Sequence, residues 1–248
     1  MSFSNTASVI QAAWPAPQNI HAYVSTRQGG VSGAPFKGLN MGAHVGDALA
    51  AVTENRHLFT ESLALPNSLV WLNQVHGTEV ACLPSACLPD AADAAFSAQK
   101  NQVCAVLTAD CLPVFFCNKA GTQVAVAHAG WRGLCDGVLE ATLEYFDNKA
   151  DVLAWFGPAI GPTAFEVGDE VKEAFMAILP QAELAFFPKQ EGKWLADLYL
   201  LARQRLEVAG VSQIYGGDYC TFTDEPHFYS YRRDGKTGRM ASVIWIGD

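Results

Sequence analysis

The stretch VCAVLTADCLPVFFCNKAGTQVAVAHAGWRG, residues 103–133, contains three apolar runs separated by polar turns. Val103–Leu107 is continuously apolar, as in a strand that is buried on both faces. Val114–Cys117 and Val124–Ala127 flank Asn118-Lys119-Ala120-Gly121, a pattern that predicts two strands joined by a hairpin turn. We therefore expect three strands here, two of them in a hairpin.

Predicted strands and helices interleave along the rest of the chain. Further strands are predicted over Ile20–Ser25, Leu69–Leu72 and Val152–Phe156, and over a C-terminal hairpin of Phe228–Arg232 and Met240–Ile246. Helices are predicted over Leu49–Leu63, Gly133–Phe146, Val171–Leu179 with Asp169 as N-cap, and Leu195–Ala209, and a surface loop over Pro84–Asp93. We expect the α/β class: one domain over residues 1–248, a mixed α+β sandwich whose mixed sheets are flanked by helices.

Composition limits the classes of function. The chain has 248 residues, of which 50% are hydrophobic, enough for a sizeable core. A formal net charge of −9 disfavours binding to nucleic acid. No stretch approaches the ~18 apolar residues of a membrane helix, and Met1–Gln11 lacks the pattern of a secretory signal. We expect a cytoplasmic protein whose seven cysteines are mostly buried thiols.

Three turns that follow expected strands each carry one potential metal ligand: His76, Cys111 and His128. Together they would form a set of two nitrogens and one sulfur. Three protein ligands with one open position distinguish a catalytic zinc site from a closed structural one, and no fourth Cys or His lies in a comparable turn. The three turns are Asn73–Gly77, Thr108–Pro113 and Ala127–Gly133.

Two chemical interpretations of these residues stay open. In the first, the three side chains bind Zn²⁺ and a water in the fourth position becomes acidic, with Asp110 orienting a ligand or acting as general base. In the second, Cys111 is a nucleophile that His128 or His76 activates. Their separations in the sequence are far from any local zinc-finger spacing and do not decide between the two.

Three arginines stand in turns that suit an anion. His128–Gly133 is a strand-to-helix turn with two glycines, so backbone N–H groups at a helix N-terminus and the Arg132 guanidinium can face one anion. Arg27, before Gly29-Gly30, and Arg232, beside Arg233, are similar candidates. A packing role for the glycines and a solvated charge for each arginine are the alternatives.

These segments occur with several others that form a recognisable set. They are Ser25–Ser32, Gly38–Asn40, His44–Asp47, Glu54–Arg56, Gly157–Pro162, Phe165–Gly168 and Ser230–Asp234. With the three ligand turns, this combination resembles the YfiH-like family. The family is also called the laccase-domain or polyphenol oxidase family and, in bacteria, the peptidoglycan editing factor. The resemblance covers roughly residues 20–246.

The resemblance implies a mixed α/β sandwich that binds zinc through His76, Cys111 and His128. It implies phosphorolysis of adenosine, inosine, guanosine and methylthioadenosine, and deamination of adenosine. Purine nucleosides and phosphate would be the partners, with Arg132, Arg27, Arg232 and Asn40 as residues that bind them. A second role proposed for the family is an amide hydrolase that removes serine misincorporated into a cell-wall precursor.

Other activities fit the residues less well. A multicopper oxidase needs a blue-copper site and a separate imidazole-rich cluster, and this chain has six histidines, so copper is expected only as an alternative metal at the same site. The HxE and PCxxC signature of zinc nucleobase deaminases is absent. A binding module with a structural zinc would need a fourth protein ligand.

Overall fold

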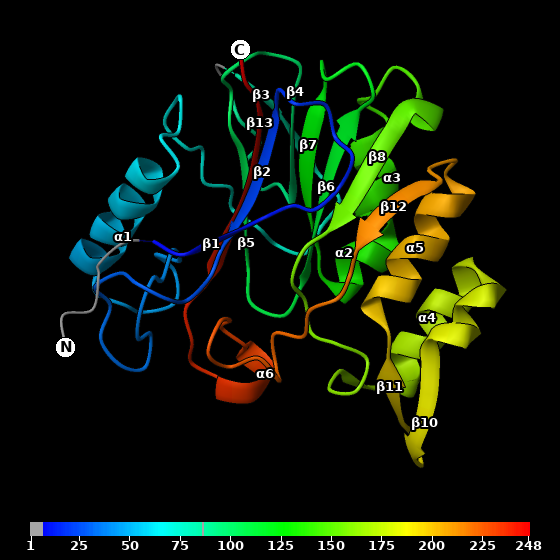
Figure 1. The fold of residues 1–248 in the computed structure, drawn as a ribbon. Coiled ribbons are helices and arrows are strands. Elements are labelled where there is room, and N and C mark those ends of the chain that lie inside the picture. Colours follow the sequence, from blue (N-terminus) through cyan, green and yellow to red (C-terminus); the bar gives the residue numbers. More distant parts are fainter. Residues whose placement is uncertain (1–6, 86) are drawn as a thin grey trace.

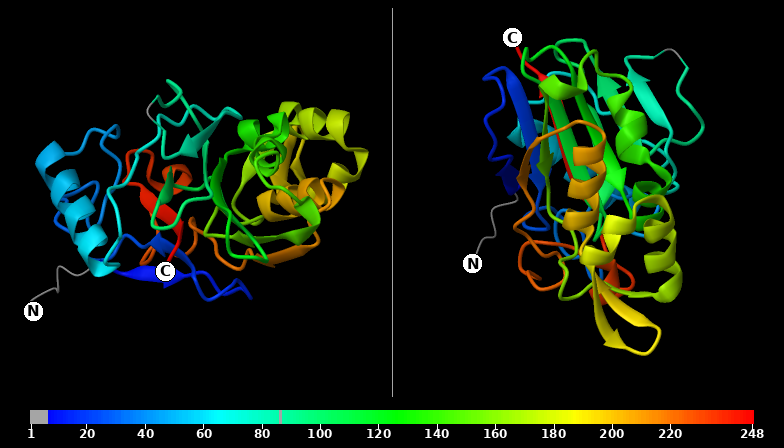
Figure 2. Two further views of the ribbon diagram at one scale, coloured as in Figure 1. Left: turned by 90° about the horizontal axis from the view of Figure 1, so that it is seen from above. Right: turned by 90° about the vertical axis from the view of Figure 1, so that its right-hand side faces the viewer.

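The protein consists of four layers, a helix, two stacked sheets and a group of helices (Figure 1; Figure 2). This computed structural model describes residues 7–85 and 87–248, so part of the Met1–Gln11 segment, in which no secretory signal is expected, lies outside it. The mixed α+β class is confirmed. None of the described helices is both long and apolar enough to cross a membrane.

Two large sheets form the inner layers. The four-stranded antiparallel sheet has the order β1 (Val9–Gln11), β2 (Ile20–Ser25), β13 (Met240–Ile246), β5 (Cys104–Thr108). The six-stranded sheet has the order β12 (Gln213–Gly216), β8 (Val152–Phe156), β6 (Leu112–Asn118), β7 (Val124–Ala129), β4 (Ala94–Ser97), β3 (Val80–Leu83). It is mixed, because its two outermost pairs are parallel and its inner pairs antiparallel.

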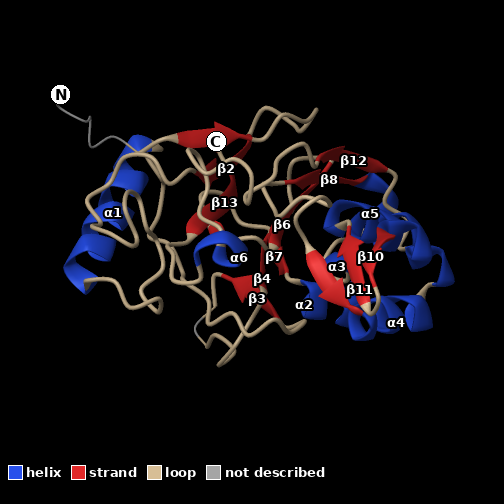
Figure 3. Cartoon of the chain, turned by 90° about the horizontal axis from the view of Figure 1, so that it is seen from below, coloured by secondary structure: helices blue, strands red, loops and turns tan. Residues whose placement is uncertain are grey.

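The remaining elements lie around these sheets. A small sheet has the order β10 (Phe186–Gln190), β11 (Lys193–Ala196), β9 (Glu166–Gly168). The helices are α1 (Leu49–Ser62), α2 (Trp131–Asp136), α3 (Val138–Leu143), α4 (Asp169–Ile178), α5 (Leu198–Val208) and α6 (Tyr231–Asp234), with 3₁₀ turns at Lys149–Asp151 and Pro180–Ala185. Seen from below, α6 lies between α1 and the group of helices (Figure 3).

Strand β6 shows why the central sequence is apolar throughout. Val114 and Phe116 pack on the side of the helices, whereas Phe115 and Cys117 pack against the four-stranded sheet. Successive side chains of a strand point to opposite faces, so a strand between two apolar layers needs hydrophobic residues at every position. The predicted hairpin is confirmed as β6 and β7.

Most predicted elements are present with small shifts in their ends. The predictions at Ile20–Ser25, Val103–Leu107, Val152–Phe156, Met240–Ile246 and Leu49–Leu63 correspond to β2, β5, β8, β13 and α1.

The strand predicted over Leu69–Leu72 is wrong. These residues belong to no sheet. The segment is instead held by side chains: the Gln74 amide donates to Leu107 O (2.8 Å) and accepts from Leu107 N (2.7 Å), and Arg56 stacks 4.1 Å from the centre of the Trp71 ring. A glutamine side chain thus replaces the backbone partner that a neighbouring strand would offer.

The helix predicted over Gly133–Phe146 is two short helices. Gly137 ends α2 with φ 104° and begins α3, because a left-handed residue breaks the α-helical ladder and glycine adopts that conformation without a Cβ clash.

Two helix starts also differ from prediction. Helix α4 begins at Asp169 itself, with Gly168 as N-cap, while the Asp169 carboxylate accepts from Trp194 Nε1 (2.7 Å). Helix α5 begins at Leu198, where the Asp197 side chain accepts from Leu200 N and caps it.

The first arm of the predicted C-terminal hairpin is wrong. Instead of a strand over Phe228–Arg232, the Ser230 side chain accepts from Arg233 N and starts the short helix α6. The surface loop predicted over Pro84–Asp93 is wrong at its end, because Ala92 and Asp93 are buried.

Candidate active site

His76, Cys111 and His128 come together although they are far apart in the sequence. Their ligand atoms all lie within 4.8 Å of one another, and among the described residues this is the single such group of three or more His, Cys, Asp or Glu side chains. Cys111 Sγ lies 3.7 Å from His76 Nε2, and the two imidazole rings are 4.8 Å apart at 70°. His76 is exposed and His128 is buried, so the cluster is open on one side.

The sheet explains two of the three positions. Cys111 directly precedes β6 and His128 is near the end of β7. The antiparallel register pairs Leu112 with Ala129, so both residues lie at the same end of this strand pair. His76 approaches from the segment before β3, where its φ of 62° turns the chain sharply.

Gly130 allows these three residues to approach one another. A Cβ on Gly130 would lie 2.5 Å from His76 Cδ2, closer than carbon atoms pack, and 3.1 Å from Cys111 Sγ, which is also a tight contact. Gly130 is also the N-cap of α2. The glycine that the sequence suggested for anion binding or packing is therefore needed for packing at this site.

The acidic residue that contacts the cluster is Asp93, which the sequence analysis missed. Asp93 Oδ1 lies 2.7 Å from His128 Nδ1, and the side chain is fully buried. Burial alone would raise the pKa of Asp93, but hydrogen bonds from His128 and from the N–H groups of Gly77 and Val75 lower it below its usual value. Asp93 is therefore a carboxylate in contact with the cluster.

Asp110, the predicted orienter or general base, faces elsewhere. Its Oδ1 accepts from Thr221 Oγ1 (2.6 Å) and its Oδ2 accepts from Arg232 N (2.7 Å). With a φ of 85°, Asp110 turns the chain just before Cys111. These contacts connect the Cys111 turn to the C-terminal segment, and both carboxylate oxygens already have a donor.

Without a bound cation, the thiol and the imidazole stabilise each other's charged forms. Burial alone would raise the pKa of Cys111, but the neighbouring His128 and His76 rings lower it to about 6. Burial alone would lower the pKa of His128, but Cys111 and Asp93 raise it to about 9. A thiolate is the form of cysteine that attacks electrophiles and binds metals.

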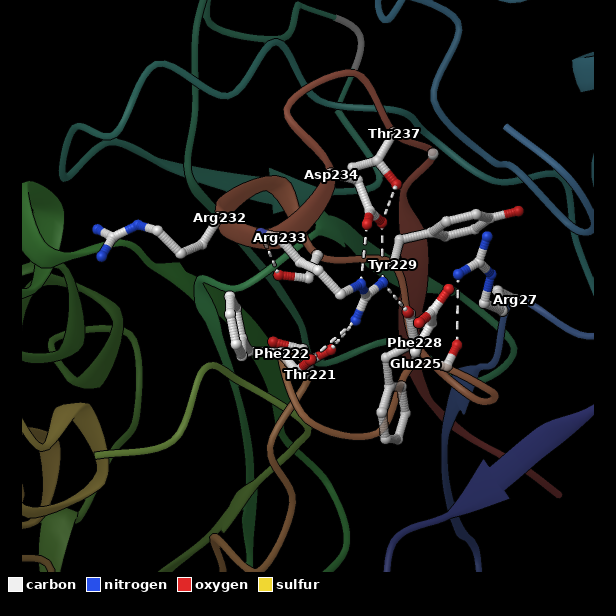
Figure 4. Close-up of polar contacts among 12 residues, drawn as sticks. Arg27, Thr221, Phe222, Glu225, Phe228, Tyr229, Arg232, Arg233, Asp234 and Thr237 are labelled. Carbon is white, nitrogen blue, oxygen red and sulfur yellow. Dashed lines mark hydrogen bonds and ion pairs between the residues drawn. The ribbon is translucent and has the colours of Figure 1, made fainter. Parts of the chain in front are cut away.

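Arg132 and Arg27 both keep unpaired donor groups among the described residues. The exposed Arg132 stacks 4.4 Å from the centre of the Trp131 ring, with no side-chain hydrogen bond to the described protein. Arg27 stacks 4.9 Å from the Tyr229 ring and donates once, to Glu225 O (3.3 Å; Figure 4).

Arg232 and Arg233 differ sharply from each other. Arg232 points away from its neighbours in Figure 4 and donates from its side chain to Glu166 O (2.8 Å). All five N–H groups of Arg233 are used. Their acceptors are Thr221 O, Phe222 O, Phe228 O and both oxygens of Asp234. Arg233 therefore has no donor left for an anion.

Asn40 is buried within a network of its own. Its amide donates to Gly42 O (3.2 Å) and Asp47 Oδ2 (2.9 Å) and accepts from Gly42 N (2.9 Å) and Arg239 N (2.9 Å). The structure does not bring the Asn40 side chain to the cluster.

Arg239 is a second residue that the sequence analysis missed. Burial lowers its pKa, and the negative forms of Cys111 and Asp110 act in the opposite direction. Burial and then the charges of Arg239 and Arg56 lower the pKa of His44. Arg239 is thus a positive charge that interacts with Cys111 in a chain whose net charge is −9.

The donor set suits a cation of intermediate softness. Two imidazole nitrogens and one thiolate are ligands that Zn²⁺ and copper ions both accept. The cluster could therefore hold a metal ion.

Known proteins resemble the chain over almost its full length. A family model described as multi-copper polyphenol oxidoreductase laccase matches residues 21–247. The purine nucleoside phosphorylase YfiH of Escherichia coli is 55% identical over 242 residues, covering 97% of this chain and 99% of that protein. A purine nucleoside phosphorylase of Haemophilus influenzae is 54% identical over 240 residues, covering 96% and 98%.

A solved structure agrees with the fold. The crystal structure of a Neisseria meningitidis protein matches with a TM-score of 0.91 and 47% sequence identity, covering 97% of this chain and 99% of that one. The resemblance to YfiH-like proteins is therefore confirmed for both sequence and fold.

Proposed function

This chain belongs to the multi-copper polyphenol oxidoreductase laccase family, and we propose that within it the chain is a metal-dependent purine nucleoside phosphorylase. The observation that carries the proposal is the open cluster of His76, Cys111 and His128 in a chain whose close relatives are named for this activity. The proposed substrates are adenosine, inosine, guanosine and methylthioadenosine, each with phosphate.

Zinc is the proposed metal, with His76, Cys111 and His128 as its ligands. Three protein ligands fit a catalytic zinc, which keeps one position for a reactant. When bound, the ion would supply a Lewis acid beside the substrate. The protein's own part is to hold the thiolate and the two rings in place and to keep one side of the cluster accessible to substrate.

Phosphorolysis also needs a site for phosphate. A phosphate oxygen forms a bond to C1′ of the ribose, the glycosidic C–N bond breaks, and the base leaves with a proton. Arg132 is our first candidate to hold the phosphate, because its guanidinium is exposed beside the Gly130 turn and its donors are unpaired within the described part of the chain. Arg27 and Arg232 follow, and Asn40 is retained only as a residue that supports the site from within its buried network.

Adenosine deamination is a second proposed activity. In this reaction the oxygen of a water bonds to C6 of the purine, the bond to the exocyclic nitrogen breaks, and ammonia leaves. The activated water must lie close to the purine, and we place it on the open side of the cluster. The same feature would serve an amide hydrolase that removes serine from a cell-wall precursor, and this remains the alternative substrate class. A cysteine nucleophile at Cys111 is the alternative that needs no metal.

Multicopper oxidation is disfavoured despite the description of the family. That chemistry needs a blue-copper site together with a separate cluster of copper ligands. Within residues 7–85 and 87–248, the structure brings together one suitable group, with two imidazoles. Copper at this group would occupy the proposed zinc site.

A product assay tests the proposal. Adenosine and inosine are each incubated with the protein, with and without phosphate, before and after treatment with a chelator. We expect free base and ribose 1-phosphate only when phosphate is present, and loss of activity on chelation that zinc restores. Base release at a rate independent of phosphate would contradict phosphorolysis, and inosine formed from adenosine would support the deaminase.

The variant Cys111→Ala separates the metal from the thiol. We expect the variant to lose bound zinc, measured by elemental analysis, and to lose detectable phosphorolysis, because one of three ligands is gone. Full zinc occupancy in Cys111→Ala would contradict the ligand assignment. Activity that survives chelation but not this substitution would favour the cysteine nucleophile.

A further inference from the structure

Asp93 connects the two histidines of the cluster. It directly precedes β4, and the register of β4 with β7 pairs Ala94 with Ala127, so Asp93 lies opposite His128. The backbone at this pair is bonded as well, because His128 N donates to Asp93 O (2.7 Å). The side chain of Asp93 has no exposed surface.

Each carboxylate oxygen of Asp93 accepts two hydrogen bonds. Oδ1 accepts from His128 Nδ1 (2.7 Å) and from His76 N (2.9 Å). Oδ2 accepts from Val75 N (3.0 Å) and from Gly77 N (2.8 Å). A single side chain therefore binds the ring of one histidine and the backbone on both sides of the other.

Only an ionised carboxylate satisfies this arrangement. Four N–H donors converge on two oxygens, and an ionised carboxylate offers acceptors alone. An asparagine in either orientation would direct its NH₂ group at two of these donors, so it would lose either the His128 contact or the turn around His76.

The contact also determines which nitrogen of His128 faces the cluster. Because Asp93 can only accept, the proton of the neutral His128 ring is on Nδ1, and the lone pair of Nε2 remains for Cys111 or a metal. The same Asp93 stabilises the left-handed backbone of His76, a conformation that is strained in a non-glycine residue.

We propose that Asp93 is the positioning residue that holds both histidines of the proposed metal site in their binding geometry. This proposal rests on the proposed function for the metal but not for the substrate. Removing the carboxylate should loosen two of the three ligands, whereas Cys111 has a separate support in the contacts of Asp110.

The main test compares metal binding by the wild type, Asp93→Asn and a control, Asp151→Asn. The control also removes one carboxylate charge, from an exposed pair with Lys119 at the surface. Zinc affinity is measured by competition with a chromophoric chelator. We expect Asp93→Asn to bind zinc about 10- to 100-fold more weakly, as for other residues that orient metal ligands, and the control to match the wild type.

Cobalt substitution distinguishes loosened ligands from a general loss of structure. In Asp93→Asn loaded with Co²⁺, the thiolate-to-cobalt absorption should persist because Cys111 stays in place, while the d–d bands change with the histidine geometry. A folded Asp93→Asn whose zinc affinity is within threefold of the wild type, or whose d–d bands are unchanged, would overturn the proposal.

A measurement on the wild type does not depend on whether the variant folds. Long-range ¹H–¹⁵N correlation spectra of the zinc-loaded protein should show the His128 proton on Nδ1, and a proton on Nε2 would overturn the proposal. A wild-type protein that binds no zinc would overturn both this proposal and the metal of the proposed function. Zinc binding without phosphorolysis would refute the proposed activity alone.

Discussion

The C-terminal segment around Arg233 and the cluster around Cys111 contrast in how far their polar groups are satisfied. Arg233 donates all five of its N–H groups to the protein, and its acceptors are backbone carbonyls and Asp234. In the cluster, Cys111 Sγ lies 3.7 Å from His76 Nε2, and the ligand atoms of all three residues lie within 4.8 Å of one another on a side that is open. Saturated donors stabilise a fold, whereas unsaturated ones are available to a ligand.

The contrast corrects a first impression from the sequence. Arg232 and Arg233 are adjacent and chemically alike, and both suggest an anion site. In the structure one is exposed with a single side-chain bond to the protein, and the other is enclosed by carbonyl oxygens (Figure 4). Local sequence does not reveal which of two neighbouring arginines turns inward.

The largest effect is expected for Arg233, whose donors are all bonded to the protein. Arg233→Ala removes the donor of three carbonyl groups and two of the hydrogen bonds to the Asp234 carboxylate, so we expect a loss of roughly 3 kcal/mol in the free energy of unfolding. Urea denaturation followed by circular dichroism measures this.

The matched control for this substitution is the neighbouring arginine. Arg232→Ala removes one exposed side-chain hydrogen bond and should cost less than about 1 kcal/mol. Equal losses for the two variants would show that saturation of the guanidinium is not what matters.

The next prediction concerns the open cluster and the rate at which Cys111 is alkylated. In metal-free protein, the lowered pKa of about 6 makes Cys111 mostly thiolate at pH 7, so it should be alkylated by iodoacetamide much faster than an ordinary thiol. The rate should fall as the pH drops through about 6, where the thiolate takes up its proton.

Mass spectrometry of the labelled peptides measures that rate against pH. The peptide carrying Cys117 is an internal control, because burial raises the pKa of this thiol to about 12 and it should stay unlabelled. A midpoint for Cys111 near that of a free cysteine would mean that the histidines do not stabilise the thiolate.

The smallest expected effect is at Arg132. If its free donors hold phosphate, Arg132→Ala should raise the KM for phosphate about 10-fold and leave the free energy of unfolding almost unchanged. Steady-state kinetics with varied phosphate check the first expectation. Lys119→Ala, at the opposite end of β6 and β7, is the control for loss of a surface cation. A loss of stability without a change in KM would assign Arg132 to packing.

The grouping of His76, Cys111 and His128 was predictable because each stands at or just after an expected strand, near residues typical of turns. His76, Cys111 and His128 follow or precede glycine, proline or aspartate, and the family resemblance covers all three. Asp93 has no such signature, because its role depends on the register between β4 and β7, and a cross-strand partner 35 residues away cannot be read locally.

The fold shows the same difference between features with a local signal in the sequence and features that depend on distant partners. Apolar runs such as Val124–Ala127 predicted the strands buried on both faces, because such a strand needs an apolar residue at every position. The segment around Leu72 failed because a side chain of Gln74 takes the place of a sheet partner. The C-terminal hairpin failed because the partners of β13 are β2 and β5, far away in the chain.

The place of β13 has a consequence for the order of assembly. β2 and β5 are not neighbours in the four-stranded sheet, and each pairs instead with β13, which is the last described strand of the chain. During synthesis, the four-stranded sheet therefore stays open until residues 240–246 have left the ribosome. Until then the edges of β2 and β5 that face β13 are unpaired, and exposed strand edges of this kind favour aggregation or binding by chaperones.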